Sequence, residues 1–133
     1  MDWITKKKPA MTGIDFLADT NFLIYLLEGR PETELFADFS FAVSFVTEIE
    51  LLGRKGISET ELQVIQALLD TCFIIELQPP IKEKAIYLKQ RHKIKVPDAL
   101  VAATAYESGL PLLTVDKAFA TLPGLDLLLL TLQ

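Results

Sequence analysis

The stretch FLADTNFLIYLL, residues 16–27, joins a buried strand to a helix and sets the pattern for the rest of the chain. Ile14–Ala18 is a short apolar run of strand length. A helical stretch follows from Thr20, and Gly29 is expected to stop it. Asp19 stands at the junction of the two elements. The stretch therefore predicts a strand, a carboxylate at the carboxyl end of that strand, and then a helix.

The same alternation of strand and helix continues to the end of the chain. The predicted strands are continuous apolar runs, as expected when helices cover both faces of a parallel sheet. Strands that alternate with helices indicate an α/β protein. We therefore predict a three-layer α/β/α sandwich with a mostly parallel sheet of four to five strands. The further predicted strands are Phe41–Val46, Cys72–Leu77, Leu110–Thr114 and Leu125–Leu130.

Two sequence patterns predict where helices begin. Thr47 and Glu50 have the spacing of a capping box, in which the first side chain and the fourth bond each other's backbone amides. Ser58 and Glu61 repeat that spacing before a stretch of leucines and isoleucine at helical intervals. We therefore expect one helix to begin at each pair.

Length and composition bound the domain organisation and the location of the protein. The 133 residues, half of them hydrophobic, fit one domain with one core. We expect an N-terminal arm at residues 1–13 and a single domain at residues 14–133. No apolar run approaches the ~20 residues of a membrane helix. The N-terminus carries lysines without a following apolar stretch, so it does not read as a secretory signal, and a cytoplasmic location is expected.

The net charge constrains any role in nucleic-acid binding. The chain carries a formal charge of −5. Proteins that bind duplexes without sequence preference usually present a basic face. A nucleic-acid role for this chain therefore requires a local positive patch or a bound metal ion.

Four acidic residues lie where strands end or helices begin. Asp19 follows the first predicted strand, and Asp116 comes two residues after the fourth. Glu50 lies near the start of the helix that follows the second strand, and Asp98 follows Pro97 at the start of another helix. Ligands of open α/β sheets sit beyond the carboxyl ends of the strands, at a topological switch point. If the first and fourth strands are neighbours, these four acids converge on one edge.

Each of these acids also has a purely structural explanation. Asp19 and Asp116 could be helix N-caps, Glu50 could close the capping box, and Asp98 could favour the positive end of its helix dipole. As a group they indicate more, because carboxylates packed together repel one another unless a cation neutralises them. An all-oxygen cluster suits a hard ion such as Mg²⁺ or Mn²⁺. Such an ion can activate water for hydrolysis of a phosphodiester.

At these residues the chain resembles the PIN-domain family, and within it the VapC-type toxin ribonucleases of toxin–antitoxin pairs. The resemblance implies a parallel sheet with helices on both faces and a Mg²⁺- or Mn²⁺-dependent endoribonuclease. It extends over nearly everything from residue 14 onward, although the arm before that point departs from the family pattern. The matching segments are FLADTNFLIYLL at 16–27, SFVTEIELLG at 44–53, VPDALVAATAYESGLPLLTVD at 96–116, and Phe119.

The resemblance also implies roles for individual residues. Asp19, Glu50, Asp98 and Asp116 match the acidic quartet of the family. We expect the three aspartates to hold the metal, while Glu50 binds a second ion or orients the attacking water. The sequence is compatible with one bound ion or with two. Glu48, a second acid close to Glu50, is expected to face solvent. The polar residues expected to support the quartet are Thr20, Asn21 and Thr114.

The basic run KQRHKIK at 89–95 ends three residues before Asp98. It could hold RNA phosphates beside the acids, or it could be a solvated helix end whose cations favour the helix dipole. Two cations just past Glu50 could extend the patch. The candidate RNA contacts are Arg54, Lys55, Lys89, Arg91, Lys93 and Lys95.

The expected partners follow from the resemblance alone: an RNA substrate, an antitoxin protein that covers the cleft, and a second copy in a homodimer. Two other readings stay open. A phosphoacceptor module also gathers acids at strand ends and needs a late lysine, for which Lys117 is available, but no adjacent acid pair follows the first strand. A PIN-like domain could also bind without cleaving, although all four acids are present.

Overall fold

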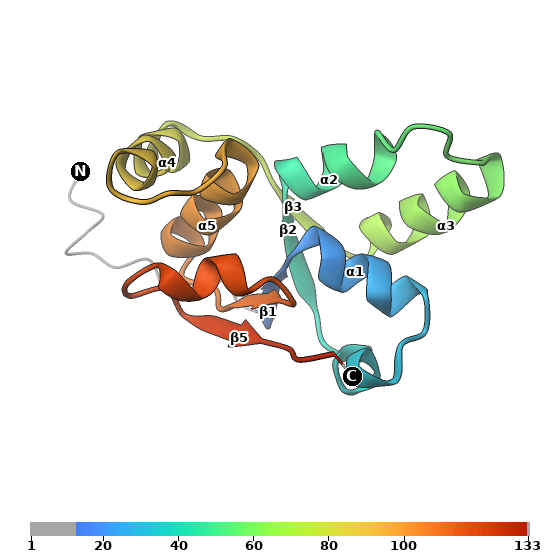
Figure 1. Cartoon of the computed structure of the whole chain (residues 1–133). Coiled ribbons are helices and arrows are strands. Elements are labelled where there is room, and N and C mark those ends of the chain that lie inside the picture. The colour runs from blue at the N-terminus through green and yellow to red at the C-terminus, as the bar shows by residue number, and fades with distance from the viewer. Residues whose placement is uncertain (1–12, 133) are drawn as a thin grey trace.

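The computed structural model describes residues 13–132, which form a parallel β-sheet between two groups of helices (Figure 1). The predicted residue 1–13 arm lies almost wholly outside the described residues. Along the chain the elements are β1 Phe16–Ala18, α1 Thr20–Leu27, η1 Pro31–Phe36, β2 Phe41–Ser44, α2 Phe45–Leu52, α3 Glu59–Asp70, β3 Phe73–Ile75, α4 Pro79–Arg91, α5 Val96–Ser108, β4 Leu112–Thr114, η2 Lys117–Thr121 and β5 Leu127–Leu129.

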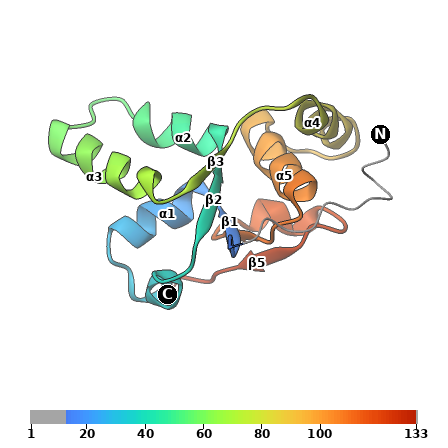
Figure 2. The same ribbon diagram turned by 180° about the vertical axis from the view of Figure 1, so that it is seen from behind.

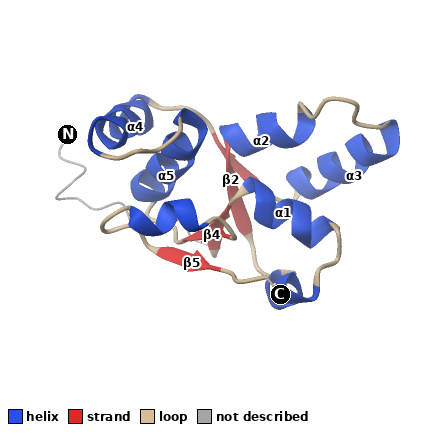
Figure 3. Cartoon of the chain, in the orientation of Figure 1, coloured by secondary structure: helices blue, strands red, loops and turns tan. Residues whose placement is uncertain are grey.

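The sheet is doubly wound, with strand order β3-β2-β1-β4-β5 and parallel pairing throughout. The chain moves outward from β1 to β3 and then returns to place β4 on the other side of β1. The order therefore reverses between β1 and β4, where Leu17 is in register with Leu112 and Ala18 with Leu113. Figure 3 shows the strands passing between the two helical layers. This confirms the predicted α/β/α sandwich, and it meets the condition that the first and fourth strands are neighbours.

Successive residues of the buried strands point to opposite faces of the sheet and pack into two separate hydrophobic cores. Leu17 and Leu112 pack with residues of α4 and α5 on one face of the sheet. Ala18 and Leu113 pack with residues of α1 and α3 on the other face. Figure 2 shows these two groups of helices from behind. Because both faces are covered, the strands need apolar residues at every position, which explains their continuous apolar runs.

The start of α2 corrects one prediction. The helix begins at Phe45, and the hydroxyl of Ser44 caps it by accepting the Val46 amide at 3.1 Å. Thr47 and Glu50 therefore form no capping box, and Glu50 lies in the second turn. The apolar residues after Ser44 resemble strand, but the cap turns them into helix. The capping box of Ser58 and Glu61 is confirmed.

Other predicted boundaries hold within a few residues. Each strand is shorter at its ends than the apolar run that predicted it. α1 ends before Gly29, and α5 ends at Gly109, whose φ of 69° is a left-handed conformation that glycine adopts without steric cost. Within residues 13–132 no helix is both long and apolar enough to cross a membrane.

Substitution of a buried leucine on the central strand β1 tests the assigned core directly. Leu17 is fully buried on β1, whereas Leu35 in η1 is 83% exposed. We expect Leu17→Ala to lower the free energy of unfolding by about 2–5 kcal/mol, because it leaves a cavity beneath α4 and α5. Leu35→Ala, the matched control, should cost little. Urea unfolding followed by circular dichroism measures both, and equal losses in the two variants would contradict the assigned core.

Candidate functional site

The carboxyl ends of β1 and β4 carry a hydrogen-bonded chain of polar groups. The Thr114 hydroxyl donates to Oδ2 of Asp19 at 2.7 Å and accepts the Asp116 amide at 3.0 Å. The amide of Asp19 donates to the carbonyl of Leu113 at 3.0 Å, and Asp19 Oδ1 accepts the Thr20 amide at 2.8 Å. Thr114 is fully buried. One buried threonine therefore ties together the two strand ends at which the sheet order reverses.

A second polar contact joins α1 to α2 beside this chain. The Thr20 hydroxyl donates to Oε1 of Glu50 at 2.6 Å and lies 3.0 Å from the hydroxyl oxygen of Thr47. Glu50 is exposed, whereas Glu48, predicted to face solvent, is only partly exposed. The contact holds Glu50 toward the start of α1, where Asp19 lies. Asn21 is exposed in the first turn of the same helix.

The first turn of α5 brings the fourth acid. Asp98 is the third residue of this helix, which starts at Val96 and has a proline at its second position. α5 packs against α2, and the charges of Asp98 and Glu50 act on each other across that contact. Lys95, the residue before the helix, offsets part of this negative charge. The acids thus lie near enough for their charges to interact, Asp19 with Asp98 and Asp116, and Asp98 with Asp116 and Glu50.

Burial and, to a lesser extent, the neighbouring acids change the ionisation of Asp19 and Asp98. Burial is the main cause that raises the pKa of Asp19 from 3.8 to about 6; the hydrogen bonds from Thr114 and Thr20 oppose the rise, and the charges of Asp98 and Asp116 add to it. The pKa of Asp98 is also raised, first by burial and then by Asp116 and Glu50. A buried carboxylate surrounded by other carboxylates favours its neutral form. The edge therefore favours the binding of a cation.

The four carboxylates are ligands that suit a hard divalent cation, although their oxygen atoms do not already form a closed metal site. Among residues 13–132, no three acidic, histidine or cysteine side chains stand close enough to form a ready-made metal site. All four candidate ligands are carboxylates, which Mg²⁺ and Mn²⁺ prefer. Asp19 is buried and held by two hydrogen bonds, while Asp98 and Asp116 are partly exposed. The chemistry of the site therefore fits a dication.

The structural explanations for the acids hold alongside this arrangement. Asp19 caps α1, and Asp116 caps η2 by accepting the Ala118 amide at 2.9 Å. In each case one carboxylate oxygen makes the cap, and for Asp19 the other oxygen accepts the Thr114 hydroxyl. Capping and a functional role are therefore compatible, because the cap fixes the orientation of the carboxylate.

The predicted RNA contacts differ in how freely their cations face solvent. Lys89 donates from Nζ to the carbonyl of Ile94 at 2.7 Å, and the Arg91 guanidinium lies 3.7 Å from the centre of the Tyr87 ring. Lys95 is the cation that acts on Asp98. Lys93 is exposed on the same loop, and Arg54 and Lys55 are exposed after α2.

Sequence reasoning missed the role of Thr47. It assigned Thr47 to a helix cap, whereas the structure buries this side chain with its hydroxyl against that of Thr20, which also donates to Glu50. Its signal in the sequence is the spacing Ser44, Thr47, Glu50, which places a polar side chain at every third residue from the cap of α2 into its second turn, on one side of the helix. That face is the one turned toward α1.

Comparisons with known proteins agree with this fold. The family model described as PIN domain matches residues 16–125. A toxin–antitoxin complex from Klebsiella pneumoniae is 34% identical with a TM-score of 0.73, covering 84% of this chain and 95% of that one. VapBC2 from Rickettsia felis bound to a promoter DNA fragment is 21% identical with a TM-score of 0.72 and coverages of 86% and 98%. VapBC-1 from nontypeable Haemophilus influenzae is 24% identical with a TM-score of 0.70 and coverages of 87% and 98%. No curated protein sequence matches the chain.

The raised pKa of Asp19 predicts a pH-dependent stability. Because the folded pKa of about 6 exceeds the ordinary 3.8, the folded state holds the proton more tightly, and stability falls as the pH rises from about 4 to above 6. The shift corresponds to at most about 3 kcal/mol. We expect Asp19→Asn, which keeps one acceptor oxygen, to raise the free energy of unfolding in EDTA at pH 8 by about 1–2 kcal/mol.

At pH 4 most of that gain should disappear, because the folded state then holds the proton and the unfolded state is only partly ionised. Denaturant titrations of the variant and the wild type across this pH range provide the measurement. Asp38→Asn is the control, since Asp38 is exposed and outside the site. A gain from Asp19→Asn that is the same at pH 4 and pH 8 would contradict the assigned cause.

Proposed function

Because this chain belongs to the PIN-domain family, we propose that it is a divalent-metal-dependent endoribonuclease and the toxin of a toxin–antitoxin pair. The observation that carries the proposal is the convergence of four carboxylates at the strand-order reversal, with Asp19 buried and its pKa raised to about 6. Such an edge is where open α/β sheets bind their ligands. The substrate would be RNA, met in the cytoplasm.

Asp19, Asp98 and Asp116 would hold the cation, Mg²⁺ or Mn²⁺. When bound, the dication would supply Lewis-acid stabilisation of the charge that develops on the phosphate during hydrolysis. Thr114 holds Asp19 in one orientation and also fixes the backbone of Asp116. Residues that orient ligands in this way set the affinity of a site for its ion.

Glu50 would either take part in binding a second ion or orient the attacking water. The hydrogen bond from Thr20 fixes its carboxylate and leaves further lone pairs for a water molecule. His92 is the only histidine of the chain, so a mechanism that uses a pair of histidines has no residues to run it. The general base at this edge would therefore be a carboxylate.

The proposed partners extend from this site. Support for an antitoxin comes from the toxin–antitoxin complex of Klebsiella pneumoniae, which is 34% identical to this chain. A homodimer is the proposed assembly of the toxin. The backbone of the RNA would be held by cations near the acids, proposed to be Arg54, Lys55, Lys89, Arg91, Lys93 and Lys95.

Cleavage of labelled RNA tests the proposal. We expect the chain to cleave single-stranded RNA with Mg²⁺ or Mn²⁺ and to stop in EDTA. Asp19→Asn and Asp98→Asn should each lower the rate by at least about 100-fold, because each removes a negative ligand from the edge. Glu50→Gln should lower the rate strongly. Glu48→Gln, the matched control two residues earlier on α2, should change the rate little.

The same assay separates the alternatives. Stable transfer of a phosphoryl group from a small phosphodonor to the chain would indicate a phosphoacceptor module. RNA binding without cleavage at any metal concentration would indicate a domain that only binds. Either result would contradict the nuclease proposal.

Thr114 gives a second test, because it acts through Asp19 and not on the substrate. Thr114→Val keeps the volume but removes the hydroxyl, so the pKa of Asp19 should rise further. The concentration of Mn²⁺ for half-maximal thermal stabilisation should then increase about 10–100-fold. Thr104→Val is the matched control, since Thr104 is equally buried but its hydroxyl donates only to the Leu100 carbonyl. Equal Mn²⁺ responses in the two variants would rule out the positioning role.

A further inference from the structure

We propose that Thr47 is a positioning residue for Glu50 and acts through the hydroxyl of Thr20; its part in cleavage rests on the proposed function. Two hydroxyls and a carboxylate form a hydrogen-bond relay between α1 and α2. Thr20 Oγ1 lies 3.0 Å from Thr47 Oγ1 and 2.6 Å from Glu50 Oε1. Thr47 is fully buried, whereas Glu50 is exposed. The relay therefore connects a fixed side chain of the interior to a carboxylate at the surface.

The number of available protons fixes the direction of the relay. A threonine hydroxyl carries one proton, and an ionised carboxylate can only accept hydrogen bonds. The Thr20 hydroxyl donates that proton to Glu50, so at the 3.0 Å contact its oxygen is the acceptor and the Thr47 hydroxyl is the donor. Hydrogen bonds in series polarise one another. The bond from Thr47 therefore strengthens the bond from Thr20 to Glu50.

Packing alone does not explain a hydroxyl at position 47. The other buried residues of α2, Val46 and Leu51, are apolar. Burial of a hydroxyl costs free energy unless the group is hydrogen-bonded. Valine has nearly the same shape as threonine and would fill the same space without that cost. The hydroxyl of Thr47 is therefore explained by its partner on α1, Thr20, and not by the core around it.

Glu50 needs such an anchor because its side chain is long and faces solvent. Holding a glutamate in one rotamer costs conformational entropy, which the contacts of that side chain must offset. Its anchor, Thr20, also donates its backbone amide to Asp19 at 2.8 Å. One residue thus orients both a buried acid and an exposed acid. By holding the Thr20 hydroxyl, Thr47 fixes the position of the Glu50 carboxylate relative to Asp19.

Two substitutions of Thr47 separate positioning from packing. Thr47→Val keeps the shape of the side chain and removes the hydroxyl, whereas Thr47→Ser keeps the hydroxyl and removes a methyl group. Positioning predicts that the valine variant lowers kcat for RNA cleavage about 5–10-fold, as for one lost hydrogen bond, and that the serine variant keeps most of the rate. Packing predicts the reverse order, because only serine leaves a cavity. Cleavage at saturating RNA and Mn²⁺, with urea unfolding of the same preparations, measures both.

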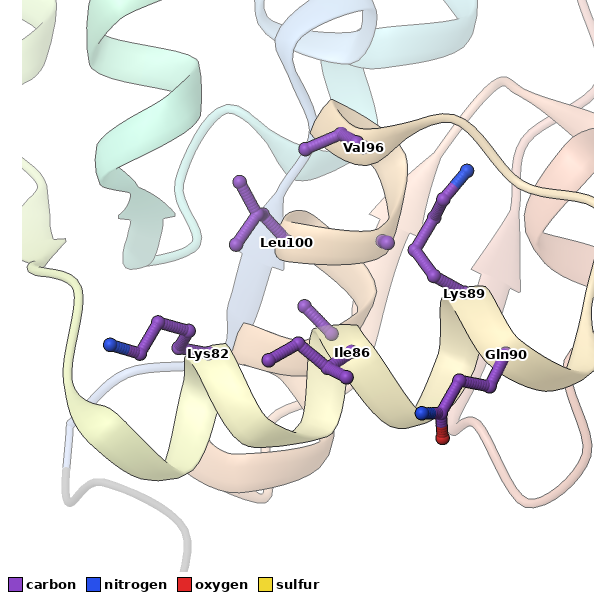
Figure 4. Close-up of a pocket in the computed structure, with 8 residues that line it drawn as sticks. Lys82, Ile86, Lys89, Gln90, Val96 and Leu100 are labelled. Atoms are coloured by element: carbon purple, nitrogen blue, oxygen red, sulfur yellow. The ribbon is translucent and has the colours of Figure 1, made fainter.

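A double-mutant cycle tests whether Thr47 acts through Glu50. In the Glu50→Gln background, Thr47→Val should change the remaining rate by no more than about twofold, because the carboxylate that it orients is already gone. Thr104→Val is the matched control. Thr104 is equally buried, but its hydroxyl donates to the carbonyl of Leu100 in its own helix, and Figure 4 shows the Leu100 side chain at the groove between α4 and α5. The control variant should cleave RNA like the wild type.

NMR of the metal-free protein reads the position of Glu50 without any activity. With carbon-13-labelled glutamate, the Glu50 side-chain signals are identified by their loss in Glu50→Gln. In Thr47→Val they should move toward the shifts of a glutamate that averages over its rotamers, because the side chain is no longer held in one of them. In Thr47→Ser and in Thr104→Val they should stay at the wild-type shifts.

Three results would overturn the positioning role while wild-type cleavage keeps the nuclease proposal. The first is a Thr47→Val variant with the rate and the Glu50 signals of the wild type. The second is a Thr47→Ser variant that is impaired as much as the valine variant. The third is an equal effect of Thr47→Val with and without the Glu50 carboxylate. If the wild type cleaves no RNA with either metal, the proposed function fails, and the NMR signals alone decide whether Thr47 holds Glu50.

Discussion

The parallel pairing of β1 with β4 is the constraint on which the site depends. The Leu17 amide donates to the Pro111 carbonyl at 2.9 Å and the Asp19 amide to the Leu113 carbonyl at 3.0 Å, so the two strands end at the same level. Only this register lets the Thr114 hydroxyl reach Asp19. A slip by one residue would turn each side chain to the opposite face of the sheet and lose both the cores and the site.

Burying Asp19 at this junction costs stability that the rest of the fold must supply. Its carboxylate accepts bonds from Thr114 and Thr20, yet burial and its acidic neighbours still raise its pKa to about 6. A side chain whose only role was to cap α1 would avoid this cost at an exposed position. The site thus fits the general pattern in which functional groups are held in unfavourable surroundings by a well-packed core, here the leucines of β1 and β4.

The fold and the position of the acids were largely predictable, because both follow from short-range patterns. Apolar runs predicted the strands, and acids at the ends of neighbouring parallel strands had to meet. The start of α2 was not predictable in the same way, since Phe45 and Val46 suit a strand and only the Ser44 cap turns them into helix. Likewise the partner of Thr47 lies on α1, and the spacing of Ser44, Thr47 and Glu50 does not tell which distant segment that side of α2 contacts.

Charge distribution explains how an acidic protein can be suited to a polyanionic substrate. A uniform charge of −5 would repel RNA, but residues 82–95 concentrate six cations on α4 and the loop after it. That segment ends at Lys95, three residues before Asp98. A cation that attracts phosphate and a carboxylate that repels it therefore lie within one turn of helix. Because surface charges are screened over about 8–10 Å at physiological salt, a strand near α4 would feel mainly the local cations. The acidic edge would then repel the phosphate until a bound dication offsets part of its charge, so binding and catalysis are expected to depend on metal differently.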